Sequence, residues 1–197
     1  AMLENFGIAV HAVEGFLHTP GDVAVVIGAG PIGIMAAQVL AVWGLRVVMT
    51  DLVPFRLHLA EQLVDGVVVT GEKTKVVDLV AELSQGHGAD FVLEAGATQS
   101  ALDLAFEVAK NCGTVVTIGT FDEDLRVNPF FSMTRREITL VSRMGRTHAT
   151  WQRMTRLLNT GKFDLQPFVS HILPFESYAQ GFNLAKTSQT MKVVLKP

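Results

Sequence analysis

Apolar residues along this chain gather into short runs that alternate with longer amphipathic stretches. Five apolar residues at 23–27 predict a strand that is buried on both faces. An apolar helix is expected over 34–43, ended by Gly44, and a second strand over 46–50. Because the alternation continues through most of the chain, it predicts an α/β fold. We expect a doubly wound, mostly parallel sheet of the Rossmann type with helices on both faces.

The spacing of apolar residues also predicts the remaining helices and strands. Further helices are expected at 3–17, 53–64, 74–83, 99–109, 149–158 and 178–186. Further strands are expected at 67–69, 90–93, 114–118, 137–141, 169–173 and 192–195. Residues 121–136 have no regular period and predict an irregular segment. Ligands of such folds bind at the carboxyl ends of the strands, so the candidate chemistry is expected there.

The turn after the first strand has the sequence GAGPIG over residues 28–33. Gly28 permits a tight turn, Gly30 lets a pyrophosphate approach the backbone, and Gly33 lets the helix pack closely on the strand. The N-terminus of the helix offers free N–H groups to phosphates. Asp51, at the end of the second strand, is expected to accept hydrogen bonds from ribose hydroxyls. The combination predicts a dinucleotide site.

The residues around Asp51 favour NAD over NADP. A carboxylate there repels a 2′-phosphate, and neither Leu52 nor Val53 supplies a cation. Arg56 stacks on the adenine in one interpretation and is a solvated helix charge in the other. Glu94, followed by Ala95, ends a central strand. It either faces the adenosine or ribose or binds neighbouring backbone, and the sequence leaves both open.

Composition and charge limit which other classes of function are possible. The 197 residues are 49% hydrophobic and 18% charged, which predicts a folded chain. The net charge of −3, without long runs of one sign, argues against a nucleic-acid partner. Neither a membrane span nor a signal peptide is expected. Cys112 is the single cysteine, which excludes an internal disulfide and fits a reducing, cytoplasmic setting. We expect Cys112 to be a small core residue rather than a nucleophile.

The histidines show no metal-ligand spacing with one another or with cysteine. His58, His87 and His148 are expected at the surface or in loops, whereas His11 and His171 have apolar neighbours typical of a core. A catalytic base at His11 is the weaker interpretation. The sequence contains no Ser-His-Asp pattern and no paired carboxylates. It predicts a cofactor site without a complete catalytic site and without a metal.

A series of segments carries a further signal: GIAVHAV, GDVAVVIGAGPIGIMAAQVLAVWG, VVMTDLVPFRLHLAEQL, DFVLEAGA, CGTVVTIG, REITLVSRMG, PFVSHILPFESYAQGF and MKVVLKP. In this order they resemble the zinc-containing medium-chain alcohol dehydrogenases, most closely the polyol, threonine and sugar-acid branch. The resemblance implies a hinge helix at 1–20, a Rossmann NAD-binding domain at 21–165 and a C-terminal return segment at 166–197. It also implies that the N-terminal catalytic domain, which carries the zinc ligands of the family, is absent from this chain.

The resemblance assigns cofactor contacts to positions of this sequence. Ile32, beside Pro31, would give its N–H to the pyrophosphate, and Arg56 would flank the adenine. Two segments would line the nicotinamide end: Ile118, Gly119 and Thr120, and Arg143, Met144 and Gly145. Glu4 matches a hinge glutamate that lies near the zinc in the polyol branch, but Asn5 stands where the family has proline.

The function implied is the NAD-binding part of a dehydrogenase that oxidises a secondary alcohol of a polyol or sugar acid by hydride transfer. Alternatives are an enzyme resembling L-threonine 3-dehydrogenase and a nucleotide-sensing module without chemistry. A methyltransferase is a third alternative, against which the third glycine of the turn argues. The implied partners are a small-molecule substrate and a second copy of the chain. A homodimer or homotetramer would form through the cofactor domain, with the strand at 137–141 as the pairing edge. The isolated chain is expected to be inactive.

Overall fold

The structure is a computed structural model that describes residues 2–187 and 189–197, and only the backbone of residues 67–70. The helices are α1 (Leu3–Val13), α2 (Pro31–Val42), α3 (Pro54–Leu63), α4 (Lys73–Leu83), α5 (Gln99–Val108), α6 (His148–Leu158) and α7 (Tyr178–Ala185). The strands are β1 (Val23–Ile27), β2 (Arg46–Asp51), β3 (Val67–Thr70), β4 (Ala89–Glu94), β5 (Ala109–Thr117), β6 (Thr139–Ser142), β7 (Val169–Pro174) and β8 (Lys192–Lys196). Each of these helices and strands overlaps one predicted from the sequence. Within the segment predicted to be irregular, Pro129–Met133 form a π-helical turn and Thr134–Arg136 a 3₁₀ turn.

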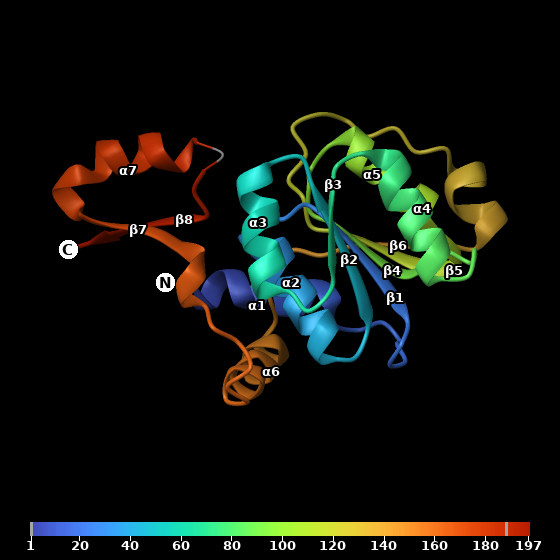
Figure 1. Ribbon diagram of the computed structural model, residues 1–197, viewed down its shortest axis with the longest axis horizontal. Helices are drawn as coiled ribbons and strands as arrows, with labels where there is room; N and C mark the ends of the chain where they lie inside the picture. The colour runs from blue at the N-terminus through green and yellow to red at the C-terminus, as the bar shows by residue number, and fades with distance from the viewer. Residues whose placement is uncertain (1, 188) are drawn as a thin grey trace.

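Within the described residues, six parallel strands form the main sheet in the order β3-β2-β1-β4-β5-β6. Helices α1, α2, α3 and α6 contribute to the apolar core on one face, and α4 and α5 cover the other (Figure 1). The strand order reverses between β1 and β4, so the crevice for a ligand lies at their carboxyl ends. This architecture confirms the doubly wound Rossmann fold expected from the sequence.

Strand β1 consists of five consecutive apolar residues because both of its faces are buried. Ala24 and Val26 belong to the core on the α2 side, whereas Val23 and Val25 belong to the core on the α5 side. All residues of the strand are buried. A strand at the centre of a sheet covered on both faces has no polar side, which is the reason for its continuous apolar run.

The first helix is shorter than the sequence predicts. It ends at Val13 rather than at residue 17, because Gly15 adopts a φ of +88° that a right-handed helix does not accept. Beyond it, Leu17 is fully exposed, whereas Phe16 turns inward and stacks on Phe91 with ring centroids 4.1 Å apart. The apolar period at 14–17 therefore belongs to a turn that covers the sheet.

The expectation that Cys112 is a core residue is wrong. Helix α5 ends at Val108 and β5 begins at once, with an irregularity in its pairing to β4 between Ala89 and Phe91. Cys112 lies in this irregular start of β5 with a φ of +60°, and its side chain is exposed. The register change turns the residue outward, although the apolar pair Val115 and Val116 follows three residues later in the same strand.

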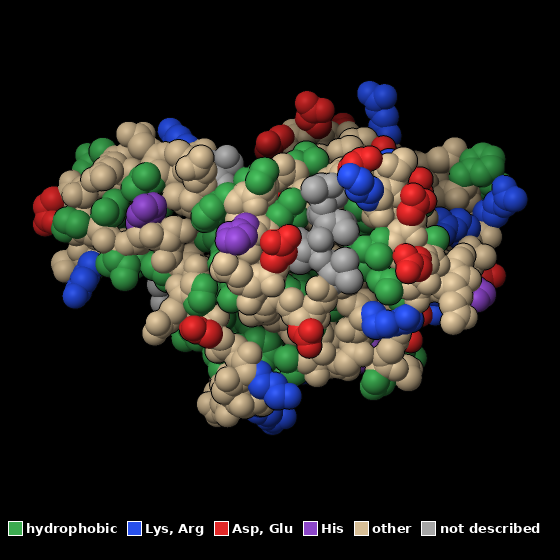
Figure 2. Space-filling model, in the orientation of Figure 1, with side chains coloured by type: hydrophobic (Ala, Val, Ile, Leu, Met, Phe, Trp, Pro, Cys, Tyr) green, Lys and Arg blue, Asp and Glu red, His purple; other side chains and the backbone are tan. Residues whose placement is uncertain are grey.

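The C-terminal elements form a separate unit beside the main sheet (Figure 1). Strands β7 and β8 pair in parallel, and α7 packs on them. Apolar side chains on this unit reach solvent: Ile172, Phe175, Tyr178 and Phe182 are each more than half exposed. Figure 2 shows apolar atoms at the surface of this unit. Exposed apolar area of this extent is typical of a surface that packs against another part of a protein.

Candidate functional site

The glycine turn between β1 and α2 is held by backbone contacts that only glycine allows. Gly28 has a φ of +109°, and a Cβ there would lie 2.8 Å from the carbonyl carbon of Ala95. A Cβ on Gly33 would lie 2.0 Å from the carbonyl oxygen of Gly28. Gly30 differs, because no atom lies within 4 Å of its Cβ position. Gly28 and Gly33 are therefore required by the fold itself, whereas Gly30 leaves open space at the N-terminus of α2.

Asp51 fixes this turn from the end of β2. Its Oδ2 accepts a hydrogen bond of 2.6 Å from the N–H of Ala29, and its Oδ1 accepts one of 2.8 Å from the N–H of Val53. The guanidinium of Arg56 lies 3.7 Å from Oδ2. Each carboxylate oxygen can accept a further hydrogen bond, so Asp51 is able to bind hydroxyl groups while it holds the turn.

Glu94 ends β4 and is fully buried. Its Oε1 accepts hydrogen bonds from the N–H groups of Gly96 (2.8 Å) and Ala97 (2.7 Å). Its Oε2 is buried without a hydrogen-bond partner among the described residues. Burial raises the pKa of Glu94, and the two backbone N–H groups offset only part of that effect. Of the two interpretations left open by the sequence, the contacts support the binding of neighbouring backbone.

A cavity of about 350 Å³ lies at the carboxyl ends of β1, β2 and β4. Five of the residues predicted from the sequence line it together: Gly28, Gly30, Asp51, Arg56 and Ala95. The Nε of Arg56 is buried without a hydrogen-bond partner among the described residues. The cavity thus combines an open backbone approach at a helix N-terminus, a carboxylate and a cation. These are the groups that an adenosine diphosphate moiety requires.

Several residues of the cavity were not predicted. Lys73, Thr98 and Ser100 line it from the first turns of α4 and α5 and the residue before α5. Lys73 forms an ion pair with Glu107 at 2.5 Å. The only signal for them in the sequence is their position after a strand at the carboxyl edge of the sheet.

The other predicted contacts lie outside this cavity. Pro31, Ile32 and Gly33 form the first turn of α2, and Glu94 is the last residue of β4. The remaining residues follow β5 (Ile118, Gly119 and Thr120) and β6 (Arg143, Met144 and Gly145). The N–H of Arg143 donates to Thr117 (3.0 Å) and so extends the ladder from β5 to β6. Met144 is 94% exposed beyond the carboxyl end of β6.

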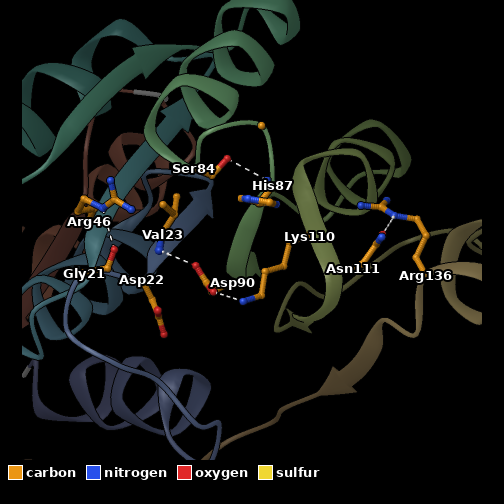
Figure 3. A pocket seen from close by; sticks show the side chains of 12 residues that line it. Gly21, Asp22, Val23, Arg46, Ser84, His87, Asp90, Lys110, Asn111 and Arg136 are labelled. Atoms are coloured by element: carbon orange, nitrogen blue, oxygen red, sulfur yellow. Dashed lines mark hydrogen bonds and ion pairs between the residues drawn. The ribbon is translucent and has the colours of Figure 1, made fainter.

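A larger hollow, of about 570 Å³, lies at the opposite, amino-terminal edge of the sheet (Figure 3). Its charged groups are already engaged. Arg46 donates to the carbonyl oxygens of Gly21 and Leu83, at 2.7 and 2.6 Å, and Lys110 pairs with Asp90. These contacts tie the starts of the strands together. We therefore place the candidate site at the carboxyl edge.

Potential metal ligands remain apart in this structure. Among the residues it describes, no three His, Cys, Asp or Glu side chains lie close enough together to hold a metal ion. Glu4 pairs with Arg146 at 2.9 Å, and the buried His11 pairs with Glu14 at 2.7 Å. The described residues therefore do not fit a zinc site.

The histidines otherwise follow the sequence analysis. His58, His87 and His148 are exposed, as expected. His11 is buried, also as expected, whereas His171 is only partly buried. Among the described residues that line the cavity at the carboxyl edge there is no histidine.

Comparison with known proteins identifies the family of this chain. Residues 31–160 match the family described as zinc-binding dehydrogenase. The chain belongs to this family. It is 31% identical to an L-threonine 3-dehydrogenase of Bacillus velezensis over 98% of its own length, and 29% identical to a sorbitol dehydrogenase of Halalkalibacterium halodurans over its whole length. Among solved structures, the alcohol dehydrogenase TADH from Thermus sp. ATN1 superposes with a TM-score of 0.91 at 28% identity.

Membership of the zinc-binding dehydrogenases confirms the resemblance found in the sequence. The chain spans 56% of the threonine dehydrogenase, 58% of the sorbitol dehydrogenase and 57% of the Thermus structure, while those matches cover nearly all of its own residues. No helix among the described residues is both long and apolar enough to cross a bilayer.

Proposed function

We propose that this chain binds NAD(H) at the carboxyl-edge cavity and discriminates against NADP(H). The observation that carries the proposal is the convergence of the open Gly30 turn and the Asp51 carboxylate in one cavity. The pyrophosphate would approach the N–H groups at the start of α2, and the ribose hydroxyls would donate to Asp51. A 2′-phosphate would meet the same carboxylate, whose repulsion disfavours NADP(H).

We further propose that the chain is the cofactor-binding part of a dehydrogenase that oxidises a secondary alcohol of a polyol or sugar acid. A threonine-type substrate is the alternative, and the threonine and sorbitol dehydrogenases among the relatives support these two classes about equally. Bound NAD would accept the hydride, while this chain would hold and orient the cofactor. Zinc ligands and substrate contacts would come from residues outside this chain.

The division into a hinge helix at 1–20, a cofactor domain at 21–165 and a return segment at 166–197 is part of the same proposal. The exposed apolar side chains of the β7–α7–β8 unit support it, because they suit packing against a further domain. Helix α1 packs on α2 and α6, so the proposed hinge helix is anchored in the cofactor domain. A homodimer would form at the free edge of β6, the last strand of the main sheet.

Titration calorimetry with NADH, NADPH and S-adenosylmethionine tests the cofactor proposal. NADH should bind, NADPH should bind at least tenfold more weakly, and the methyl donor should not bind. The variant Asp51→Asn should narrow the preference between NADH and NADPH. The matched control Glu61→Gln, which changes an exposed acid on α3, should leave it unchanged. Equal affinity of the unmodified chain for NADH and NADPH would contradict the role of Asp51. Binding of the methyl donor alone would favour a methyltransferase.

A further inference from the structure

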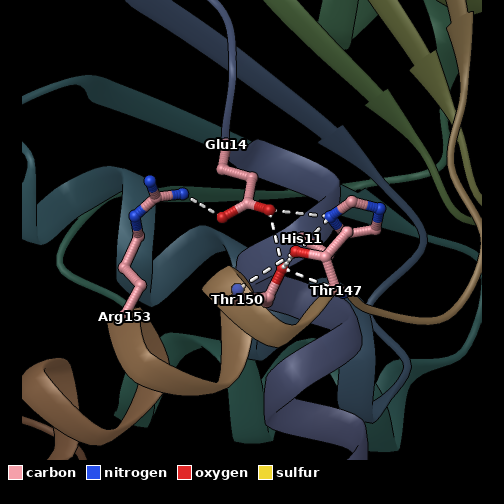
Figure 4. Close-up of polar contacts among 5 residues, drawn as sticks. All are labelled: His11, Glu14, Thr147, Thr150 and Arg153. Carbon is pink, nitrogen blue, oxygen red and sulfur yellow. Dashed lines mark hydrogen bonds and ion pairs between the residues drawn. The ribbon is translucent and has the colours of Figure 1, made fainter.

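A polar cluster joins α1 to the start of α6 on the face of the sheet that these helices share (Figure 4). Oε1 of Glu14 accepts a hydrogen bond of 2.7 Å from the hydroxyl of Thr150 and contacts Nδ1 of His11 at 2.7 Å. Its Oε2 pairs with the guanidinium of Arg153. The cluster connects residues that lie far apart in the sequence, so it is a tertiary contact and not a local cap.

Thr150 has two roles in this cluster. It is fully buried, and its side chain completes the capping box of α6 with Thr147. Its hydroxyl accepts from the N–H of Thr147 (3.2 Å) while it donates to Glu14. The Glu14 carboxylate therefore holds the first turn of α6 directly.

Glu14 remains charged in this environment. Burial alone would raise the pKa of Glu14, but the hydrogen bonds from His11 and Thr150 and the charge of Arg153 together lower it. A charged, mostly buried carboxylate with several partners makes stronger and more directional hydrogen bonds than a neutral pair. The contact between α1 and α6 is thus specific in geometry.

The loop of residues 143–147 connects β6 to α6 and lies against α1 and the turn that follows it. Arg146 forms an ion pair with Glu4 of α1, and the guanidinium of Arg143 lies close to Gly15, 3.1 Å from where a Cβ would be. A Cβ on Gly7 would lie 2.8 Å from the side chain of Arg146, so the loop and helix approach closely there. Between the two arginines, Met144 is left exposed at the carboxyl edge of the sheet.

We propose that Glu14 is a positioning residue, which through Thr150 holds the loop of residues 143–147 against the nicotinamide half of bound NAD(H). The proposal rests on the proposed cofactor function. In a sheet with this strand order a dinucleotide lies across the carboxyl edge, with one half on each side of the strand-order reversal. The cavity with Asp51 takes the adenosine half, so the loop after β6 lies on the side of the other half.

Comparison of NADH with ADP-ribose, which lacks the nicotinamide, tests this role. The variants are Glu14→Gln and Thr150→Val, the second of which removes the hydroxyl with little change in volume. Each should weaken NADH binding about five- to tenfold, the effect of one well-placed hydrogen bond, and change ADP-ribose binding less than twofold. The enhancement of NADH fluorescence on binding, which reports the nicotinamide environment, should fall in both variants. Glu72→Gln, which breaks an exposed pair with Lys75 on α4, is the matched control and should change neither ligand.

The outcomes separate the two proposals. If both variants bind NADH and ADP-ribose as the unmodified chain does, Glu14 has no positioning role. Equal weakening of NADH and ADP-ribose binding would also overturn the positioning role of Glu14, because a purely structural effect acts on the whole site. If the unmodified chain binds neither ligand, the proposed cofactor function itself is wrong. A variant that fails to fold is replaced by the other, since they act on opposite ends of one hydrogen bond.

Discussion

Replacing Gly33 by alanine should destabilise the fold, whereas the same change at Gly30 should impair only binding. The Cβ of Gly33→Ala would lie 2.0 Å from the carbonyl oxygen of Gly28, where real Cβ contacts do not fall below 3.0 Å. The oxygen cannot retreat easily. The N–H of Gly28 donates to Thr50 at 2.8 Å, and the next N–H donates to Asp51. Relief therefore requires α2 to move away from β1.

The size of the effect follows from this overlap. Overpacking of a rigid core costs about 1–3 kcal/mol and more where backbone must move, so we expect about 3 kcal/mol for Gly33→Ala. With a urea dependence of about 2 kcal/mol per M, the unfolding midpoint should fall by about 1.5 M.

Gly30→Ala should change the stability of the fold little and weaken the binding of NADH. Gly30 has a φ of −69° and a ψ of 174°, a conformation open to alanine, and its Cβ position is empty. Alanine is a less favourable N-cap residue than glycine, which destabilises the helix, but it also reduces the conformational freedom of the unfolded chain, which stabilises the fold. Because these two effects nearly cancel, the unfolding free energy should stay within about 1 kcal/mol of that of the unmodified chain. Its methyl group would occupy the approach to the N-terminus of α2, and NADH binding should weaken at least tenfold.

Urea unfolding followed by circular dichroism, together with NADH titration, measures both variants. The reasoning fails if Gly33→Ala unfolds at the midpoint of the unmodified chain. It also fails if Gly30→Ala is the less stable of the two.

Four further outcomes are expected. Asp51→Ser combined with Leu52→Arg should shift preference toward NADPH, measured by calorimetry, and no shift would contradict the assignment of the ribose site. Since the raised pKa of Glu94 favours its neutral form, its contribution to stability is present below the ordinary pKa of 4.5 and is lost as the pH rises through the folded-state pKa. Glu94→Gln should then be more stable than the unmodified chain by about 1 kcal/mol at pH 7, a gain that disappears near pH 4 in urea titrations. Leu140→Lys on the exposed edge of β6 should convert a dimer to a monomer in sedimentation, and a monomeric unmodified chain would refute pairing there. The chain alone should reduce no NAD with sorbitol, threonine or simple alcohols and should contain no stoichiometric zinc by elemental analysis.

The main sheet and its glycine turn could be predicted because their signals are local. One continuous unit contains the strand at 23–27, the turn at 28–33 and, at the end of the next strand, Asp51. In a doubly wound sheet each of these parts has a fixed place. The lining of the cavity by Arg56 follows from the same unit, because α3 begins directly after β2.

Other features depend on contacts that a single sequence does not display. The bond between Glu14 and Thr150 joins residues more than a hundred positions apart. The exposure of Cys112 depends on the register of β5 against β4, which shifts at Ala89. The position of Lys73 in the cavity depends on how α4 begins after β3. Each is decided by packing between elements and not by the period within one element.

With the proposed role of Asp51 at the ribose, the contacts of this side chain imply that cofactor preference and folding cannot change independently in this protein. The carboxylate holds the glycine turn through the N–H of Ala29 and the residue before α3 through the N–H of Val53. A lineage that loses the carboxylate to admit a phosphorylated ribose also removes the brace of its own glycine loop. Side chains that retain an oxygen acceptor, such as serine or asparagine, are therefore the accessible first steps. Replacement by alanine would require a stabilising change elsewhere beforehand.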